Sequence, residues 1–490
     1  MNFCFPLCPY TLYRKEMIDI DKNLILRKIS KISDDKGVEV YAVGGFVRDE
    51  LLGKDGKDID FVVIGNGPEF AKLVAKELGT RKTIVYEKFG TALVEYRDYK
   101  LEFVGARKES YRGDSRKPEV VPADLPTDLA RRDFTINALA IVLNKDNFGQ
   151  ILDPFDGQKD LKNKIIRTPL DPVATFKDDP LRIMRAIRFA AQLGFEIEPN
   201  TKAGMKQMAE RLRILSQERI TDEFIKILAA PKPSLGFLLM DESSLLTIIF
   251  PELVKLKGVE QVDGHHHKDV FYHTLRVVDN TAAVTDNLNL LFTALVHDIA
   301  KPQTKEFKQG KGWTFHNHEE LGARMLPAIG RRLRLPNEMI KYAQKLTRLH
   351  LRPIALTEED VSDSAYRRLL VQAGEHLEDL LTLCRADITS HNPKRVKQHL
   401  KNFDFVVKRL REVKEKDRMR AFQSPVRGDE IMEVCGLKPG PKVGKLKKMI
   451  EEAILEGEIP NEHDAALEYL LKIKDEVLIG NVGNGKERFD

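Results

Sequence analysis

The chain changes its hydrophobic period once along its length, and this change limits the folds that it can adopt. Between residues 23 and 168, runs such as VEVYAVGG, DIDFVVIG and KLEFVGA alternate with helical stretches, and a period of two is typical of half-buried strands. From about residue 170 onward, segments such as PLRIMRAIRFAAQLGF place apolar residues at helical spacing instead. The sequence therefore predicts the α+β fold class, with a strand-containing first part and a mainly helical remainder.

The length of 490 residues exceeds what one hydrophobic core usually organises, so several domains are expected. Composition breaks fall at KGVEQVDGHHHKD and at AFQSPVRGDE. We expect five parts, namely a tail (1–22), an α+β head (23–168), a helical neck (169–255), a histidine-rich body (256–400) and a C-terminal helical segment (401–490).

Composition favours a protein without a membrane segment. No apolar run approaches the ~18 residues that a membrane span needs, and the net charge of +5 permits an anionic partner without requiring one. The four cysteines form no close paired framework, which fits the reducing cytoplasm. Pro6 and Pro9 interrupt the apolar N-terminus, which argues against a signal peptide. Because Met17 lies just before an ordinary amphipathic start, we hypothesise that residues 1–16 are not translated, and N-terminal sequencing tests this.

Two aspartates on one predicted strand form the strongest candidate site. In DIDF, side chains alternate, so Ile59 and Phe61 enter the core while Asp58 and Asp60 project together into a cleft. Glu102, in LEF, repeats the pattern of a carboxylate between two core residues and would complete a three-carboxylate site. Two Mg²⁺ ions held in this way would activate an attacking hydroxyl and stabilise a pyrophosphate leaving group. The simpler alternative is that DID is only the polar face of an edge strand.

A glycine pair precedes this strand, in GGFVRD. Gly44 and Gly45 ahead of a helix would expose backbone N–H groups to a triphosphate, and Arg48 would add a bidentate phosphate clamp. The alternative is an ordinary turn. The glycine turn, the carboxylate pair and the third carboxylate follow one another in order, which favours the functional interpretation.

Two further segments surround the candidate site. Residues 107–124 are rich in charge, Gly and Pro and predict a long mobile loop, a type that is often functional. A helix is expected over residues 128–143, where Asp133 and Asn137 are four residues apart and would lie on one face. For Arg131 and Arg132 on this helix, surface ion pairing is the competing explanation.

The body contains histidines and aspartates in an ordered series of H, HD, H, H and D. Its members are His273, His297, Asp298, His318, His350 and Asp387. Imidazoles and carboxylates at this density suit Mn²⁺, Fe²⁺, Ni²⁺ or Zn²⁺, and a bound metal would generate hydroxide that attacks a phosphoester. The alternatives are structural histidines, or a fold that keeps no chemistry. His265, His266 and His267 predict a solvated loop, and His316 is expected to be a bystander.

The order of these motifs resembles the class II CCA-adding tRNA nucleotidyltransferases and bacterial poly(A) polymerases. GGFVRDELLG with KDIDFVV resembles the metal-binding signature of the family, RRDFTINALA its second signature and LDPFDGQKDL its third. The likeness continues through DDPLRIMRAIRFAAQLGF and LSQERITDEFIKIL and covers roughly residues 23–475. The H, HD, H, H, D series resembles HD-domain phosphohydrolases. The resemblance implies a polymerase-beta-like mixed-sheet head, an all-α neck, an HD-type body and a helical C-terminal segment.

The resemblance also implies roles for single residues. Arg48, Arg132, Asp133 and Asn137 would handle phosphate and ribose, while Asp179 and Arg182 would read the base. A carboxylate that accepts from an exocyclic amine and a guanidinium that donates to a ring nitrogen select cytosine and adenine together. The competing explanation is that Asp179 and Pro180 begin a helix, and Asp178 departs from the Glu that the family usually has.

The remaining expectations concern RNA. Arg107, Glu109 and Tyr111 lie in the segment that resembles the family's flexible specificity loop. Lys442, Lys445, Lys447 and Lys448 would face tRNA phosphates, unless they form an ordinary lysine-rich helix face. The expected activity is addition of CCA to tRNA from CTP and ATP. The rivals are a poly(A) polymerase, a partial CC- or A-adding enzyme, and an HD phosphohydrolase with an RNA-binding head.

Overall fold

The structure is a computed structural model, and it forms two compact units. One unit combines Met1–Leu351 with Glu378–Lys397, and the other combines Arg352–Leu377 with Gln398–Asp490. Among the residues that the structure describes, no helix has the length and apolar character that crossing a membrane requires. The described residues are 18, 20, 22–87, 90–110, 119–263, 266–309, 312–357, 361–390, 392–421, 424–455 and 458–479.

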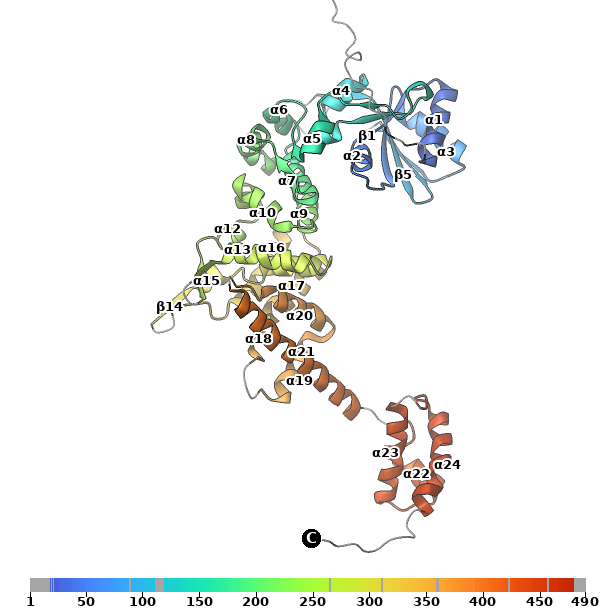
Figure 1. The fold of residues 1–490 in the computed structure, drawn as a ribbon, viewed down its shortest axis with the longest axis vertical. Coiled ribbons are helices and arrows are strands. Elements are labelled where there is room, and N and C mark those ends of the chain that lie inside the picture. The colour runs from blue at the N-terminus through green and yellow to red at the C-terminus, as the bar shows by residue number, and fades with distance from the viewer. Residues whose placement is uncertain are drawn as a thin grey trace, which may run out of the picture. The chain divides into compact units, whose positions relative to one another are not determined.

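The head is built on one mixed sheet, as predicted (Figure 1). The sheet has seven strands in the order β3-β4-β5-β2-β1-β8-β9. The β2 and β5 strands are parallel, and the other neighbouring pairs are antiparallel. The strands are β1 (Val40–Val43), β2 (Asp58–Val63), β3 (Thr83–Tyr86), β4 (Thr91–Tyr96), β5 (Tyr99–Gly105), β8 (Ala140–Val142) and β9 (Ile151–Leu152).

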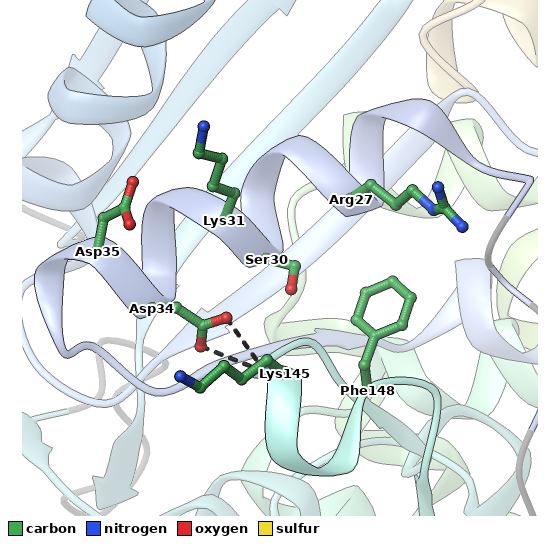
Figure 2. A pocket seen from close by; sticks show the side chains of 7 residues that line it. All are labelled: Arg27, Ser30, Lys31, Asp34, Asp35, Lys145 and Phe148. Carbon is green, nitrogen blue, oxygen red and sulfur yellow. Dashed lines mark hydrogen bonds between the residues drawn. The ribbon is translucent and has the colours of Figure 1, made fainter.

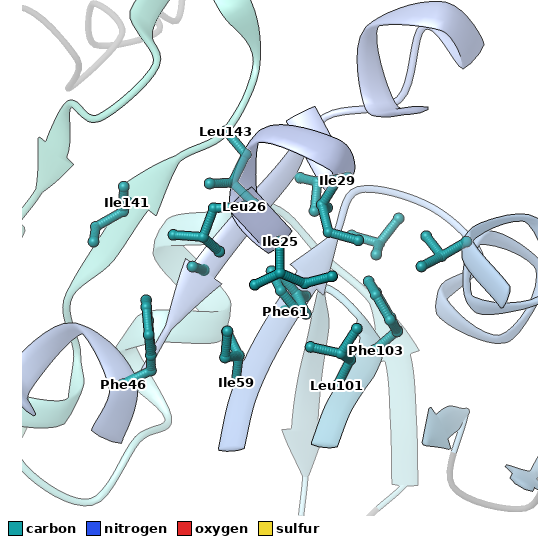
Figure 3. Close-up of a cluster of buried hydrophobic side chains, with 14 of the residues drawn as sticks. Ile25, Leu26, Ile29, Phe46, Ile59, Phe61, Leu101, Phe103, Ile141 and Leu143 are labelled. Atoms are coloured by element: carbon teal, nitrogen blue, oxygen red, sulfur yellow. The ribbon is translucent and has the colours of Figure 1, made fainter. Parts of the chain in front are cut away.

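Two helices, α1 (Leu24–Lys36) and α3 (Gly67–Leu78), cover one face of this sheet. Their apolar residues pack on side chains such as Ile59 and Phe61 of β2 and Phe103 of β5 (Figure 3). The rings of Phe61 and Phe103 are stacked with centroids 4.7 Å apart. The core therefore fixes which side chains of β2 and β5 must point to the opposite face.

The structure corrects two expectations about segments that flank the site. The ends of the predicted loop form an antiparallel hairpin of β6 (Arg107–Ser110) and β7 (Glu119–Pro122), and residues 111–118 lie outside the described ones. The helix predicted over 128–143 is wrong, because α4 (Leu125–Ala130) ends early and is followed by a 3-10 turn (Thr135–Asn137) and β8. β8 is an interior strand buried on both faces, and such an apolar run cannot be distinguished from a buried helix by its periodicity.

The neck is helical, as predicted, and its short strand β11 (Glu196–Ile197) pairs in parallel with β10 (Ile165–Ile166) at the end of the head. Its longest helix, α7, follows Pro180 and ends at Gly194, which adopts the left-handed conformation that a glycine C-cap allows. The neck helices are α6 (Pro172–Asp178), α7 (Leu181–Leu193), α8 (Pro199–Met208), α9 (Gln217–Leu228), α10 (Pro233–Glu242), α11 (Leu245–Ile249) and α12 (Pro251–Val254), and α5 (Gly157–Asn163) precedes them in the head.

The histidine-rich body is a group of helices with two small hairpins. The first hairpin pairs β12 (Glu260–Asp263) with β13 (His266–Asp269), so His266 and His267 lie on a strand and not in the predicted loop, while His265 lies outside the described residues. The second pairs β14 (Glu306–Lys308) with β15 (Gly312–Thr314). The helices are α13 (Val270–Ala282), α14 (Leu288–Val296), α15 (Lys301–Thr304), α16 (His318–Arg332), α17 (Asn337–Leu349) and α20 (Leu377–Asp387).

The second unit is helical and has a core of its own. Ile431, Leu446, Ile450 and Leu470 belong to one buried cluster, which joins α22, α23 and α24. The helices are α18 (Arg352–Ala355), α19 (Asp363–Ala373), α22 (Gly428–Cys435), α23 (Pro441–Leu455) and α24 (His463–Ile479), with most of α21 (Pro393–Ala421).

Candidate active site and candidate metal centre

The strand pair β2 and β5 brings the three predicted carboxylates to one face of the sheet. Ile59 is buried on the α1 side, whereas Asp58 and Asp60 are exposed on the other. Because β2 and β5 are parallel and in register, Glu102 lies directly beside Asp60. The parallel pairing, and not only alternation within one strand, therefore assembles the acidic face.

Gly44 lies immediately in front of this face, at the start of α2 (Gly45–Leu51). Its φ of 74° and ψ of −135° are values that L side chains rarely adopt. A Cβ at this position would lie 2.9 Å from Nη1 of Arg132 and 3.5 Å from Oδ2 of Asp60. The left-handed φ therefore requires a glycine, and a Cβ would in addition displace the guanidinium of Arg132.

The acidic face is electrostatically suited to a cation. The protein around Asp60 raises the pKa of this carboxyl by desolvation, and Asp58 adds to the shift, while Arg132 opposes it. Desolvation and the charge of Asp60 also raise the pKa of Glu102. Hard carboxylate oxygens that repel one another fit Mg²⁺, although the described ligand atoms do not gather within 4.8 Å as those of the histidine cluster do.

Asp128, which the sequence reasoning missed, anchors the basic residues beside this face. It is fully buried. Its Oδ1 accepts from Nη2 of Arg131 at 2.6 Å and from the backbone N–H of Arg107 at 3.3 Å, while Oδ2 accepts from Nη2 of Arg132 at 3.3 Å. One carboxylate thus joins the start of the β6–β7 hairpin to the arginine pair of the second motif. The sequence contained one signal for this contact, because Asp128 on α4 precedes Arg132 by four residues, a spacing that brings side chains together.

The predicted Asp133 and Asn137 meet despite the absence of the expected helix. Asn137 Nδ2 donates to Oδ1 of Asp133 at 2.9 Å, and Arg48 Nη1 donates to Oδ1 of Asn137 at 2.8 Å. Arg48 also donates two hydrogen bonds to Asp49, so it is integrated into this network. Arg185, another residue that the sequence reasoning missed, pairs with Asp133 at 2.6 Å. Burial alone would raise the pKa of Asp133, but Arg185 and Asn137 hold it below its usual value.

The predicted base-reading pair lies where α6 meets α7. Asp179 Oδ1 accepts from the backbone N–H of Leu181 at 3.1 Å, and its Oδ2 lies 3.3 Å from Nη2 of Arg219. Arg182 Nη2 donates to the backbone carbonyl of Arg131 at 2.7 Å. Asp179 therefore makes the backbone contact expected if Asp179 and Pro180 only begin a helix. The guanidinium of Arg182 is hydrogen-bonded to the RRDFTINALA segment through Arg131.

The specificity segment is only partly described. The backbone N–H of Arg107 is bound by Asp128 at the first residue of β6. Glu109 lies on β6. Tyr111 lies outside the described residues.

Asp128→Asn should lower transferase turnover by roughly 10- to 100-fold, because the arginine pair loses the charge that orients it. Radiolabelled nucleotide incorporation into tRNA measures this. Asp160→Asn is a matched control, since Asp160 is also a buried aspartate and accepts from Thr135 Oγ1 and Arg167 Nε away from the acidic face. Equal activity losses in the two variants would contradict the orienting role.

The histidine series of the body gathers around one buried carboxylate. Asp298 Oδ2 lies 3.3 Å from Nε2 of His297 and 3.6 Å from Nε2 of His273. Its Oδ1 lies 3.2 Å from Nε2 of His318 and 3.8 Å from Nε2 of His350. All five residues are buried, and they form two overlapping groups whose ligand atoms lie within 4.8 Å of one another.

Hydrogen bonds orient the rings toward this centre. Nδ1 of His297, His318 and His350 lies 2.8, 2.7 and 2.6 Å, respectively, from a backbone carbonyl three residues earlier. Because a carbonyl only accepts, each Nδ1 carries a proton and each Nε2 is available as a ligand. Asp387 completes the set, with Oδ1 2.8 Å from Nε2 of His273.

The donor set fits a divalent cation. Burial alone would raise the pKa of Asp298, but His297 and Lys301 hold it well below its usual value. Burial opposes protonation of His297, yet Asp298 and Asp387 raise its pKa to about 10. Burial also lowers the pKa of His350 to about 3. A cation and the Nε2 proton of His297 would therefore compete for the same carboxylates, which couples metal affinity to pH.

Outside these two sites, the predicted lysines and one pocket were located. On α23, Lys447 pairs with Glu451 at 3.9 Å and Lys448 with Glu452 at 3.5 Å, and Lys445 is exposed. Lys442 lies on the first turn of the same helix.

A pocket in the head is formed by α1 and the turn after β8 (Figure 2). It lies on the α1 side of the sheet, opposite the carboxylates. It contains none of the predicted site residues; its lining is Arg27, Ser30, Lys31, Asp34, Asp35, Lys145 and Phe148.

Comparison with known proteins identifies the family. Residues 40–167 match the poly A polymerase head domain, residues 194–256 match the probable RNA and SrmB-binding site of polymerase A, and residues 270–392 match the HD domain. An A-adding tRNA nucleotidyltransferase of Deinococcus radiodurans is 30% identical over 433 residues, which cover 86% of this chain and 93% of the relative. The chain belongs to the tRNA nucleotidyltransferase family.

Other members of the tRNA nucleotidyltransferase family agree with this assignment. A multifunctional CCA protein of Vibrio parahaemolyticus is 34% identical over 367 residues, which cover 71% of this chain and 85% of the relative. A crystal structure of a tRNA nucleotidyltransferase complexed with a primer tRNA and an incoming ATP analog has a TM-score of 0.56 and 27% identity, covering 79% of this chain and 99% of its own. The predicted family, enzyme class and fused HD domain are thus confirmed.

Proposed function

We propose that the chain adds cytidine, cytidine and adenosine to the 3′ end of tRNA from CTP and ATP, releasing pyrophosphate, in the cytoplasm. The observation that carries this proposal is the acidic face of β2 and β5, with Gly44 and Arg132 directly in front of it. The relatives named for CCA addition or A addition support it. We also propose that the chain is divided as its sequence predicts, into a tail (1–22), an α+β head (23–168), a helical neck (169–255), a histidine-rich body (256–400) and a C-terminal helical segment (401–490).

In the proposed mechanism, Asp58 and Asp60 would hold Mg²⁺ together with Glu102. When bound there, Mg²⁺ supplies activation of the attacking 3′-hydroxyl and charge stabilisation of the pyrophosphate. Arg132 would contact phosphate, oriented by Asp128. The N–H groups at Gly44 and Gly45 add donors without a Cβ in the way.

The other predicted residues have proposed roles in nucleotide selection. Asp133 and Asn137, linked to each other and to Arg48, would hold the ribose. Asp179 would accept from the exocyclic amine of the base, and Arg182 would donate to its ring nitrogen. Guanine and uracil present the opposite polarity and would leave these groups unpaired.

Three incubations of one tRNA that lacks CCA test the proposed function. CTP alone should yield two added residues, ATP alone should yield no addition to this substrate, and both together should yield CCA. A purely A-adding enzyme would act only on tRNA that already ends in CC. A poly(A) polymerase would extend with ATP alone, and either result would contradict complete CCA addition.

Deletion of residues 112–117 should abolish A addition while C addition is retained. The reason is the proposed role of the segment that contains Arg107, Glu109 and Tyr111 in switching specificity from C to A. Product length on sequencing gels, with CTP alone and with both nucleotides, measures the effect. Unchanged A addition would refute the role.

We propose a second activity, hydrolysis of phosphoesters by the HD centre. The observation that favours it is the orientation of His297, His318 and His350. In each ring, Nδ1 is hydrogen-bonded to a backbone carbonyl, and Nε2 points toward Asp298. His273, His297, Asp298 and Asp387 would hold a metal such as Mn²⁺, Fe²⁺, Ni²⁺ or Zn²⁺, with His318 and His350 completing the site. A metal bound there supplies hydroxide at neutral pH.

tRNA would be bound mainly through its shape and backbone, because A-form helices hide base edges from side chains. Lys442, Lys445, Lys447 and Lys448 on α23 are the proposed phosphate contacts in the second unit. Affinity that depends on such contacts falls with rising salt.

A further inference from the structure

The hairpin β14–β15 in the body carries two exposed aromatic side chains. Phe307 and Trp313 are directly opposite each other across the two strands. Their rings contact edge to face with centroids 5.2 Å apart, yet 63% and 42% of these side chains remain exposed. Lys305 Nζ lies 4.5 Å from the centroid of the Trp313 ring. An exposed aromatic pair with a cation at its face indicates a binding surface more than a packing element.

The same hairpin leads directly to the HD centre. Phe315 follows Trp313 by two residues, and its carbonyl accepts from Nδ1 of His318 at 2.7 Å. Lys301 Nζ lies 5.7 Å from the centroid of the Phe315 ring and donates to Oδ2 of Asp298 at 2.7 Å. The backbone that carries Trp313 therefore continues into the residue whose carbonyl orients His318, a ligand histidine of the HD centre.

We propose that Phe307, Trp313 and Lys305 form a stacking platform for a base near the 3′ end of an RNA whose terminal phosphoester is hydrolysed at the HD centre. This proposal rests on the phosphohydrolase activity proposed above. Aromatic faces stack on any nucleobase, and a lysine beside them attracts the phosphate backbone, so the surface suits RNA without sequence preference. In the hydrolysis, water supplies the oxygen of the new P–O bond. The P–O bond to a ribose oxygen breaks, and that oxygen takes a proton.

The platform distinguishes RNA ends from small phosphoesters. A substrate with no base would reach the metal but gain nothing from the hairpin, whereas an RNA end would gain a stacked base. Loss of one stacking partner should weaken RNA binding by roughly 5- to 100-fold, the range for a single base stacked on an aromatic ring.

Trp313 is the single tryptophan of the chain, so its fluorescence reports directly on this surface. The full chain is titrated with a five-nucleotide RNA that ends in a cyclic phosphate. We expect quenching of the tryptophan emission, with a Kd that rises in Phe307→Ala and is restored in Phe307→Tyr. Val284→Ala is the control, because Val284 is an exposed apolar residue of the same domain, at 69%. Unchanged emission on RNA addition, as expected for a hairpin that binds a protein partner, would overturn the proposal.

Catalysis supplies a second readout that separates the two proposals. With added Mn²⁺ or Ni²⁺, hydrolysis of the RNA and of bis(p-nitrophenyl) phosphate is measured for each variant. Trp313→Ala should lower kcat/KM for the RNA by about 10-fold or more relative to kcat/KM for the small diester. An equal change for both substrates would overturn the platform. If the unmodified chain hydrolyses neither substrate, the phosphohydrolase proposal fails, and the fluorescence titration alone decides whether the platform binds RNA.

Discussion

Asp60→Asn is expected to lower CMP and AMP incorporation by on the order of 10³-fold or more, because an amide replaces an anionic metal ligand at the centre of the acidic face. The folded protein should be as stable as the unmodified chain or more stable. Desolvation and Asp58 raise the pKa of Asp60, so the charged carboxylate is less favoured in the folded state than in the unfolded chain. Incorporation of radiolabelled nucleotide and thermal unfolding measure the two effects.

Asp98→Asn is the control for this substitution. Asp98 is an exposed aspartate that pairs with Lys57 at the edge of the acidic strand, and exposed pairs of this kind contribute little to stability. It should leave incorporation within about twofold of the unmodified chain. Full activity in Asp60→Asn, or in the double variant with Asp58→Asn, would refute the proposed transferase site.

Asp298→Asn should lower the metal affinity of the HD centre by about 100-fold or more and remove phosphoester hydrolysis, while nucleotide addition is retained. Asp298 lies near Nε2 of four histidines, and its charge also compensates Lys301. Breaking such a buried pair costs roughly 3–5 kcal/mol. Metal content by mass spectrometry, hydrolysis of bis(p-nitrophenyl) phosphate, incorporation of radiolabelled nucleotide and thermal unfolding measure the four outcomes.

The control for the HD centre is Asp286→Asn, an exposed aspartate of the same domain. It should keep the metal content and the hydrolytic rate of the unmodified chain. Metal bound at full occupancy in Asp298→Asn would show that the cluster does not hold the cation. Loss of nucleotide addition in the same variant would contradict the separation of the two activities.

Much of the fold could be predicted because the spacing of apolar residues along the sequence reflects which face of each strand or helix is buried. Alternation around Ile59 and Phe61 predicted β2 and its exposed aspartates, and the switch to helical spacing predicted the neck. The helix over residues 128–143 was wrong because every side chain of β8 is buried, which leaves no polar face to reveal the period. The strand pairing at residues 107–122 was also missed, since charge and proline outweighed a weak alternation.

The candidate sites could be predicted only where a motif marked them. The carboxylates and the histidine series stood out by type and order, and the structure brings each set together. Asp128 and Arg185 were missed because their importance depends on contacts to residues of other elements, Arg107 and Asp133. Such contacts follow from tertiary packing and leave no periodic trace in one sequence.

The in-register pairing of β2 with β5 makes the acidic face sensitive to chain length. Asp60 lies beside Glu102 only in the observed register of β2 and β5. A single residue inserted within β5 ahead of Leu101 would turn Glu102 toward α1 and present a neighbouring apolar side chain beside Asp60. Mutational tolerance in the head should therefore be uneven. Changes of length should be tolerated in the turns between strands. One-residue insertions within the paired parts of β2 and β5 should abolish nucleotide transfer even where the sheet still forms.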